Sequence, residues 1–202
     1  MLDLCGANES LITVLKLGGI LSCVFYVKLY APKDIWLALA LLVTLAADII
    51  LALDNTSMWG VLCFCLTQML HTARLEKIPA QTTPYYLMAI AIIVAMGLIM
   101  ELNLTVVFAG AYAFLLINNV GISLKQHNLK RSLMARFGAA GFCLFLLCDI
   151  CVAGSFLAGS GIIPIALKRI LDFLAWVFYF PSQIFIANSS ENMIKLKQYE
   201  GR

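Results

Sequence analysis

Long apolar runs alternate with short polar connections along the 202 residues of this chain. About 20 predominantly apolar residues are enough for an α-helix to cross the hydrocarbon core of a bilayer. The connections contain turn-forming and charged residues that would end such helices. The pattern therefore predicts an all-α polytopic bundle of seven transmembrane helices, near residues 11–30, 35–53, 58–73, 85–100, 104–124, 137–156 and 169–187.

The composition agrees with a membrane location for the whole chain. Hydrophobic residues make up 62% of the sequence, charged residues only 12%, and the mean hydropathy is +0.94. A soluble domain carries about 25% charged residues. No linker, low-complexity tract or repeat of fixed period is visible, so we expect a single transmembrane domain over residues 1–202. The net charge of +3 is small, and the basic residues lie in short connections, so the charge gives no support to nucleic-acid binding.

Basic residues follow the first, third, fifth and seventh helices, whereas the connections after the second, fourth and sixth begin without them. Because cytoplasmic loops are enriched in Lys and Arg, this alternation predicts an outside N terminus and a cytoplasmic C terminus. We expect the plasma membrane of a bacterium. Lys168 and Arg169 are the exception, near the outer end of the last helix. An eighth helix would have to use residues 162–167, which are too few to span. The cytoplasmic basic residues are Lys28, Lys33, Arg74, Lys77, Lys125, Lys130, Arg131, Arg136, Lys195, Lys197 and Arg202.

Two aspartates lie inside predicted spans, Asp48 in the second and Asp149 in the sixth. A charged side chain at that depth costs a few kcal/mol on insertion scales, and such residues usually have a partner or a function. A rise of about 1.5 Å per residue puts both within about 8–11 Å of the outer helix ends. Four other polar residues fall at about 8–15 Å, which predicts one polar layer built from six helices. These four are Lys16, Gln68, Tyr112 and Tyr179.

Most of the polar residues also have a structural interpretation. Tyr112 and Tyr179 are compatible with core aromatics whose hydroxyls are satisfied, and Gln68 and His71 with interhelical hydrogen bonding. Lys16 can face the layer or extend toward the interface. The aspartates differ, because a buried ion pair with one lysine cannot neutralise two carboxylates.

The cysteines suggest a metal site only weakly. Cys148 and Cys151 form a CxxC around Asp149, and Cys63 and Cys65 lie on another helix. Zinc sites of this spacing normally lie on turns rather than inside apolar helices, so we interpret these thiols as reduced packing residues. We expect neither a metal nor a cofactor. Motifs of phosphate, zinc-protease or serine-esterase chemistry are absent.

Several spacings in this chain resemble those of the YhhN-like lysoplasmalogenase family of membrane proteins. Ala47 and Asp48 correspond to the family's Gly-Asp, and Lys16 to its early lysine. The other matches cover most of the chain in order and are Gly60, Phe64, Tyr112, Gly141, Phe145, Asp149, Tyr179 and Gln183. The family typically has eight helices, so the alignment implies that this chain lacks the first.

The departures from the family pattern lie close to the expected site. Gln68 replaces a histidine, His71 a tyrosine, Cys148 a serine, and Leu17 a proline. These substitutions are expected to affect the substrate specificity and the activity that the resemblance implies.

The resemblance implies hydrolysis of the vinyl ether of lysoplasmalogens to a fatty aldehyde and a glycerophospho-alcohol. Asp48 and Asp149 would be catalytic, one as acid and one as carboxylate, and the sequence does not assign the two roles. The lysophospholipid would contact Lys16, Gln68, His71, Tyr112, Tyr179 and Gln183. One alternative is an ion- or proton-coupled transporter or sensor that uses the same aspartates. Another is an inactive structural relative, which the substitution at Gln68 leaves open. The sequence leaves the oligomeric state open.

Overall fold

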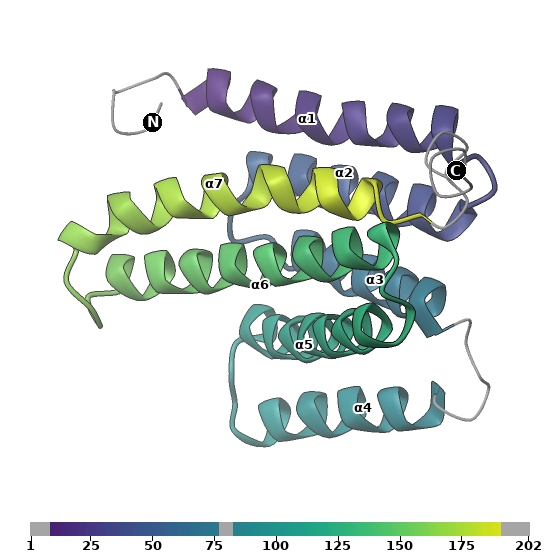
Figure 1. The fold of residues 1–202 in the computed structure, drawn as a ribbon. Coiled ribbons are helices and arrows are strands. Elements are labelled where there is room, and N and C mark those ends of the chain that lie inside the picture. The colour runs from purple at the N-terminus through teal and green to yellow at the C-terminus, as the bar shows by residue number, and fades with distance from the viewer. Residues whose placement is uncertain (1–8, 77–82, 191–202) are drawn as a thin grey trace, which may run out of the picture.

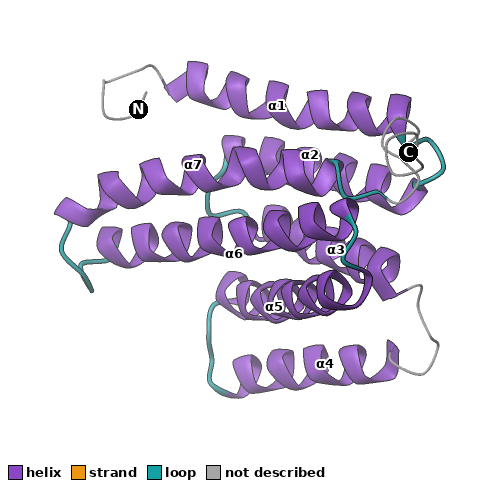
Figure 2. Cartoon of the chain, in the orientation of Figure 1, coloured by secondary structure: helices purple, strands orange, loops and turns teal. Residues whose placement is uncertain are grey.

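The structure is a computed structural model that describes residues 9–76 and 83–190 (Figure 1). Those residues form seven helices and no strand, which confirms the all-α prediction (Figure 2). The helices are α1 (Glu9–Tyr30), α2 (Ile35–Leu53), α3 (Met58–Glu76), α4 (Thr83–Ile99), α5 (Leu104–Lys130), α6 (Leu133–Gly159) and α7 (Ala166–Ala187).

The predicted helix ends differ from the observed ones mainly between α5 and α6. The apolar pattern placed these ends at residues 124 and 137, but both helices continue, and only Arg131 and Ser132 separate them. Arg131 adopts a left-handed conformation with φ of 49° that ends α5, and the Ser132 hydroxyl accepts a hydrogen bond from the Ala135 amide. The predicted helices were too short because their polar end turns continue beyond the apolar segment that the pattern detects.

Six of the helices form a closed ring in the order α1, α2, α3, α5, α6, α7 and back to α1. Each of these neighbouring pairs packs directly, whereas α4 lies outside the ring against α5 (Figure 1). A closed ring gives every member one face toward a shared interior. Polar side chains on those six inner faces can therefore meet without contacting lipid.

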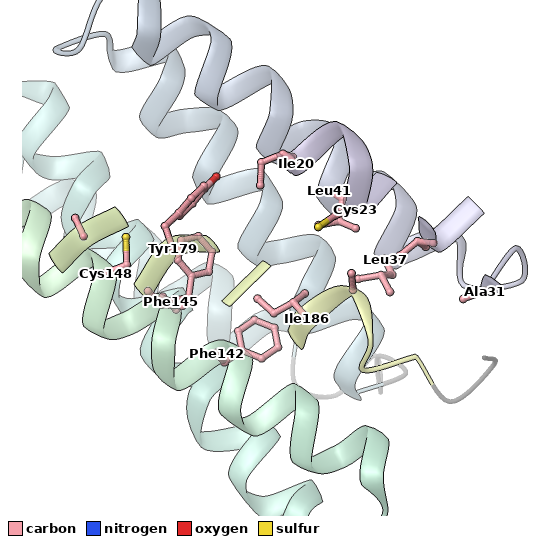
Figure 3. Close-up of a cluster of buried hydrophobic side chains, with 14 of the residues drawn as sticks. Ile20, Cys23, Ala31, Leu37, Leu41, Phe142, Phe145, Cys148, Tyr179 and Ile186 are labelled. Carbon is pink, nitrogen blue, oxygen red and sulfur yellow. The ribbon is translucent and has the colours of Figure 1, made fainter. Parts of the chain in front are cut away.

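Helices α6 and α7 approach each other closely at Gly141. A Cβ atom added there would lie 2.9 Å from the Ile186 amide nitrogen and 3.1 Å from the Ser182 carbonyl oxygen. These distances leave no room for any larger residue. The adjoining core contains Phe142, Phe145 and Ile186 (Figure 3).

Five helices, α1, α2, α5, α6 and α7, are long and apolar enough to cross a bilayer. This agrees with five of the seven predicted spans and indicates an integral membrane protein. In α3 the buried residues include Gln68 and His71, while the exposed ones include Leu66 and Met69. The lower hydropathy of α3 therefore comes partly from the face that points into the ring and partly from Arg74 and Glu76 in its last turn. The remaining helix, α4, has 17 residues.

The described charges differ between the two ends of the bundle. We call "basic end" the end at which α1, α3, α5 and α7 finish, where the described charged residues are Lys28, Lys33, Asp34, Arg74, Glu76, Lys125, Lys130, Arg131 and Arg136. At the opposite end, Lys168, one of the two exceptions to the charge pattern, forms an ion pair of 2.8 Å with Asp172 one turn later in α7. Lys77, Lys195, Lys197 and Arg202 lie outside the described residues, and the membrane orientation stays a prediction.

Candidate functional site

Asp48 is completely buried inside the ring and has partners on two other helices. One carboxylate oxygen, Oδ1, lies 2.8 Å from the ammonium nitrogen of Lys16 on α1. The other, Oδ2, accepts a hydrogen bond from the hydroxyl of Tyr179 on α7. This arrangement neutralises a carboxylate that would otherwise be costly to bury.

Lys16 faces the interior of the ring, which resolves the two orientations that the sequence allowed. Its side chain is 25% exposed, and its ammonium lies 5.4 Å from the ring centre of Trp176 and 5.0 Å from that of Tyr179. A cation at this distance from an aromatic face is attracted to it. Asp48 and the two aromatic rings therefore hold Lys16 in the polar site.

Asp149 on α6 is the second membrane-depth carboxylate. Its Oδ2 accepts a hydrogen bond from the hydroxyl of Tyr112 on α5. Within the described residues no cation forms an ion pair with it, although Lys16 lies close enough for electrostatic interaction with both aspartates. Tyr179 also interacts electrostatically with both carboxylates. The two aspartates therefore share one electrostatic environment and differ in their direct partners.

A chain of aromatic rings connects the two tyrosines. Phe64 lies 5.7 Å from Tyr112 and 6.3 Å from Phe145, and Phe145 lies 6.0 Å from Tyr179 (centroid distances). Figure 3 shows Phe145 beside Tyr179. From the sequence, Phe64 and Phe145 were assigned no role beyond the family resemblance. In the structure they form an apolar wall beside the carboxylates.

Gln68 and His71 lie on α3, farther toward the basic end. Asn119 on α5 donates one hydrogen bond to the Gln68 side-chain oxygen and one to its backbone oxygen, both 2.9 Å long. The ring of His71 packs edge-on against Phe142. Two buried atoms, Gln68 Nε2 and His71 Nδ1, have no hydrogen-bond partner among the described residues. Buried polar atoms are usually paired, so these two mark a place for water or a polar ligand group.

Gln183, the remaining predicted contact residue, is buried on α7. Its amide nitrogen lies 3.5 Å from the Ser182 hydroxyl oxygen. Direct contacts thus join Lys16, Asp48 and Tyr179 in one group and Tyr112 with Asp149 in a second. The site roles assigned from the sequence stay predictions.

Contacts also occur between residues that lie at unequal distances from their helix ends. Counted from the observed ends at 1.5 Å per residue, Asp48 is about 8 Å deep and Tyr179 about 20 Å, yet the two are hydrogen-bonded. The depth range of about 8–15 Å expected from the sequence rests partly on helix ends that were placed too far inward, such as residue 169 for α7. Because helices in a bundle are staggered, residue counting gives depth only roughly.

The described cysteines are free thiols, and three of them, Cys23, Cys148 and Cys151, are buried. In the described part of the chain, no three His, Cys, Asp or Glu side chains are grouped so that they could hold a metal ion.

A buried ion pair at the basic end was not predicted from the sequence. Arg74 Nε lies 3.0 Å from Asp34 Oδ2, and both side chains are 9% exposed. Ser189 accepts hydrogen bonds from both terminal guanidinium nitrogens, and Ser190 donates one to Asp34. The available signal was Asp34 directly before a helix, where it accepts a bond from the Leu37 amide as an N-cap.

In a comparison with protein families, the chain matches the YhhN family over residues 11–190. No curated protein and no solved structure matches the chain. The matched segment includes all the described ring helices apart from the first residues of α1, and it contains both aspartates. The chain therefore belongs to the YhhN family.

Proposed function

We propose that this protein is an intramembrane hydrolase that cleaves the vinyl ether bond of lysoplasmalogens, releasing a fatty aldehyde and a glycerophospho-alcohol. The observation that carries the proposal is the pair of unlike aspartates inside one ring, with Asp48 paired to Lys16 and Asp149 bonded to the neutral hydroxyl of Tyr112. Family membership and the membrane-embedded fold support a lipid substrate.

The contacts of the two aspartates favour different protonation states. The ammonium of Lys16 stabilises the ionised form of Asp48. A carboxyl group that lies beside an apolar wall and has no ion-pair partner favours its neutral form. Asp149 is such a group. We therefore assign Asp149 as the general acid and Asp48 as the carboxylate that activates water.

The reaction begins when Asp149 transfers its proton to the β-carbon of the vinyl ether, which leaves an oxocarbenium ion. The ionised carboxylate of Asp48 and the apolar wall of Phe64 and Phe145 would stabilise this cation. Water then adds to the cationic carbon and loses its proton to Asp48. Asp48 then gives its proton to the departing glycerol oxygen as the hemiacetal C–O bond breaks, and the hemiacetal hydroxyl loses its proton to Asp149. The aldehyde leaves, and both carboxyl groups are back in their starting protonation states.

Other residues would position the substrate and water. Gln68 Nε2 and His71 Nδ1 are buried without partners in the described structure and would bind water or the glycerol hydroxyl. Phe64 and Phe145 would pack against the hydrocarbon chain next to the vinyl ether.

The first test compares aspartate variants of the purified protein. Asp149→Asn and Asp48→Asn should each lower aldehyde release by at least about 100-fold, as for the loss of a general acid or base. Asp172→Asn is the matched control, because the carboxylate of Asp172 pairs with Lys168 and accepts a hydrogen bond from Ser155, outside the two contact groups that contain Asp48 and Asp149. Mass spectrometry would quantify aldehyde from lysoplasmalogen and from a diacyl lipid. Full activity of either site variant would end the proposal.

A second test follows the transferred proton. In deuterated water the mechanism places one deuterium on carbon 2 of the aldehyde, because that carbon was the protonated β-carbon. The aldehyde would be reduced at once to the alcohol, which prevents later exchange. Aldehyde without deuterium at this carbon would exclude proton transfer to the vinyl ether.

One observation favours the alternative of a proton- or ion-coupled carrier. Buried polar residues continue from the carboxylates toward the basic end through Gln68, Thr72, Asn119 and Ser123. Such a series could support proton movement. Reconstituted vesicles under a pH gradient distinguish the two functions: a carrier would acidify the lumen in a manner that requires Asp149, whereas a hydrolase would not.

A further inference from the structure

A cavity of about 460 Å³ opens at the basic end of the ring, where α2, α3, α5 and α6 come together. Three cationic side chains, Lys33, Arg74 and Lys130, and one carboxylate, Asp34, line it, so the charged lining carries a net charge of +2. The uncharged lining includes Ser123 and Gln126. The cavity therefore combines a positive charge with polar and apolar walls, and it is open to one side of the bundle.

The carboxylate of Asp34 is already engaged by the protein. Its Oδ1 accepts a bond from the Leu37 amide, and its Oδ2 accepts bonds from Arg74 and Ser190. Arg74 keeps donors for a ligand, because a guanidinium has five N–H groups and its bonds to Asp34 and Ser189 account for three. The pocket thus offers Arg74 as a fixed and partly available fork for oxyanions.

The wall of the cavity also has an apolar component at the surface. Trp36 lines it and is 47% exposed, and the neighbouring Ile35 is 64% exposed. Trp beside Lys is characteristic of the level of lipid headgroups in membrane proteins. Basic pockets between helices at this level bind anionic headgroups.

The cavity is too far from the two aspartates to hold the phosphate of a lysoplasmalogen undergoing cleavage. Along α2, Asp34 and Asp48 are 14 residues apart, or about 21 Å, and along α6, Gly138 and Asp149 are 11 residues apart, or about 16 Å. In a glycerophospholipid about five bonds of about 1.5 Å separate the phosphorus from the vinyl ether oxygen, which gives less than about 8 Å. The two sites therefore take different molecules.

We propose that this basic-end cavity is a second site that binds the phosphate group of an anionic ligand, between Lys33, Arg74 and Lys130. The phosphate could belong to a membrane phospholipid or to a soluble phosphoester, since both present the same oxyanion. A lipid would place its chains along exposed apolar residues such as Ile35. The proposal does not depend on the hydrolase reaction and would hold for an inactive protein.

Native mass spectrometry of the full chain in detergent would test the site with two pairs of probes. Phosphatidylglycerol is compared with diacylglycerol, and glycerol 3-phosphate with glycerol, so that each pair differs in the phosphate. We expect one phosphate-bearing probe to bind at one per chain and its partner not to bind. Retention of phosphatidylglycerol alone identifies a lipid headgroup, and binding of glycerol 3-phosphate identifies a soluble phosphoester. Failure of both phosphate probes to bind would overturn the proposal.

Charge variants locate the site. The double variant Lys33→Gln, Lys130→Gln should bind at least about tenfold more weakly, because it removes charged donors at the cavity. The matched control Lys125→Gln, Arg136→Gln removes the same charge from exposed residues at the same end that do not line the cavity, and should bind as the parent does. Equal weakening in both would show attraction to the whole basic end and would contradict the proposal. Melting temperatures monitor folding, and the single lysine variants supply the same comparison if the double variant unfolds.

Discussion

Replacing Lys16 with methionine should destabilise the protein by leaving the carboxylate of Asp48 buried without its cation. Breaking a fully buried ion pair in this way costs about 3–5 kcal/mol. Asp48 is 0% exposed, but Lys16 is 25% exposed, so water can replace part of the lost interaction. We therefore expect a loss of about 2–3 kcal/mol, which corresponds to a fall in melting temperature of about 5–10 °C for a chain of this size.

A double variant separates the buried charge from ordinary loss of packing. Adding Asp48→Asn to Lys16→Met removes the unpaired charge, so the double variant should melt at a higher temperature than Lys16→Met alone. Lys28→Met is the control, because Lys28 is exposed on the same helix and should change the melting temperature little. The melting curve can be followed by tryptophan fluorescence in detergent. A Lys16→Met protein that melts with the parent, or a double variant less stable than Lys16→Met, would refute the reasoning.

Two further variants test the helix contacts by the same melting curves. Gly141→Ala should lose about 1–3 kcal/mol, because its new Cβ would lie 3.1 Å from the Ser182 carbonyl oxygen and closer still to other atoms of α7. Gly18→Ala, which meets nothing within 4 Å, should be neutral or gain up to about 1 kcal/mol, and equal losses in both would contradict the close packing. Arg74→Met should lose about 3 kcal/mol, since it leaves Asp34 buried at 9% exposure without its cation. Adding Asp34→Asn should restore part of that loss, and no restoration would argue against an energetically important pair.

The apolar pattern predicted the helices well because it reports a property of each segment alone. Turns such as the one between α1 and α2 interrupt the pattern and could be located to within a few residues. Helix ends rich in polar residues were missed, as at Lys130 and Leu133, because the same helical turns can continue outside an apolar layer. The prediction of a shared polar layer relied on counting residues, and the stagger of α7 showed the limit of that method.

Side-chain partners were harder to predict than segments. Tyr112 and Tyr179 were identified as layer residues, but the sequence could not say that Tyr112 bonds Asp149 and Tyr179 bonds Asp48. The partnership of Arg74 with Asp34 was missed entirely, since Arg74 was interpreted only as a loop charge and Asp34 was assigned no role. Such pairs depend on which helices are neighbours, and no periodicity within one helix contains that information.

The sequence by itself determined a membrane-embedded chain of seven helices, with two acidic residues at depths where lipid would penalise them. These results follow from local hydropathy and from the cost of burying charge, both of which act on each segment separately. Only the tertiary structure decided that α4 stays outside a closed ring of six helices and that Lys16 pairs with Asp48 rather than with Asp149. The reason is geometric: ring closure fixes which inner faces meet, and that choice gives the two carboxylates different partners.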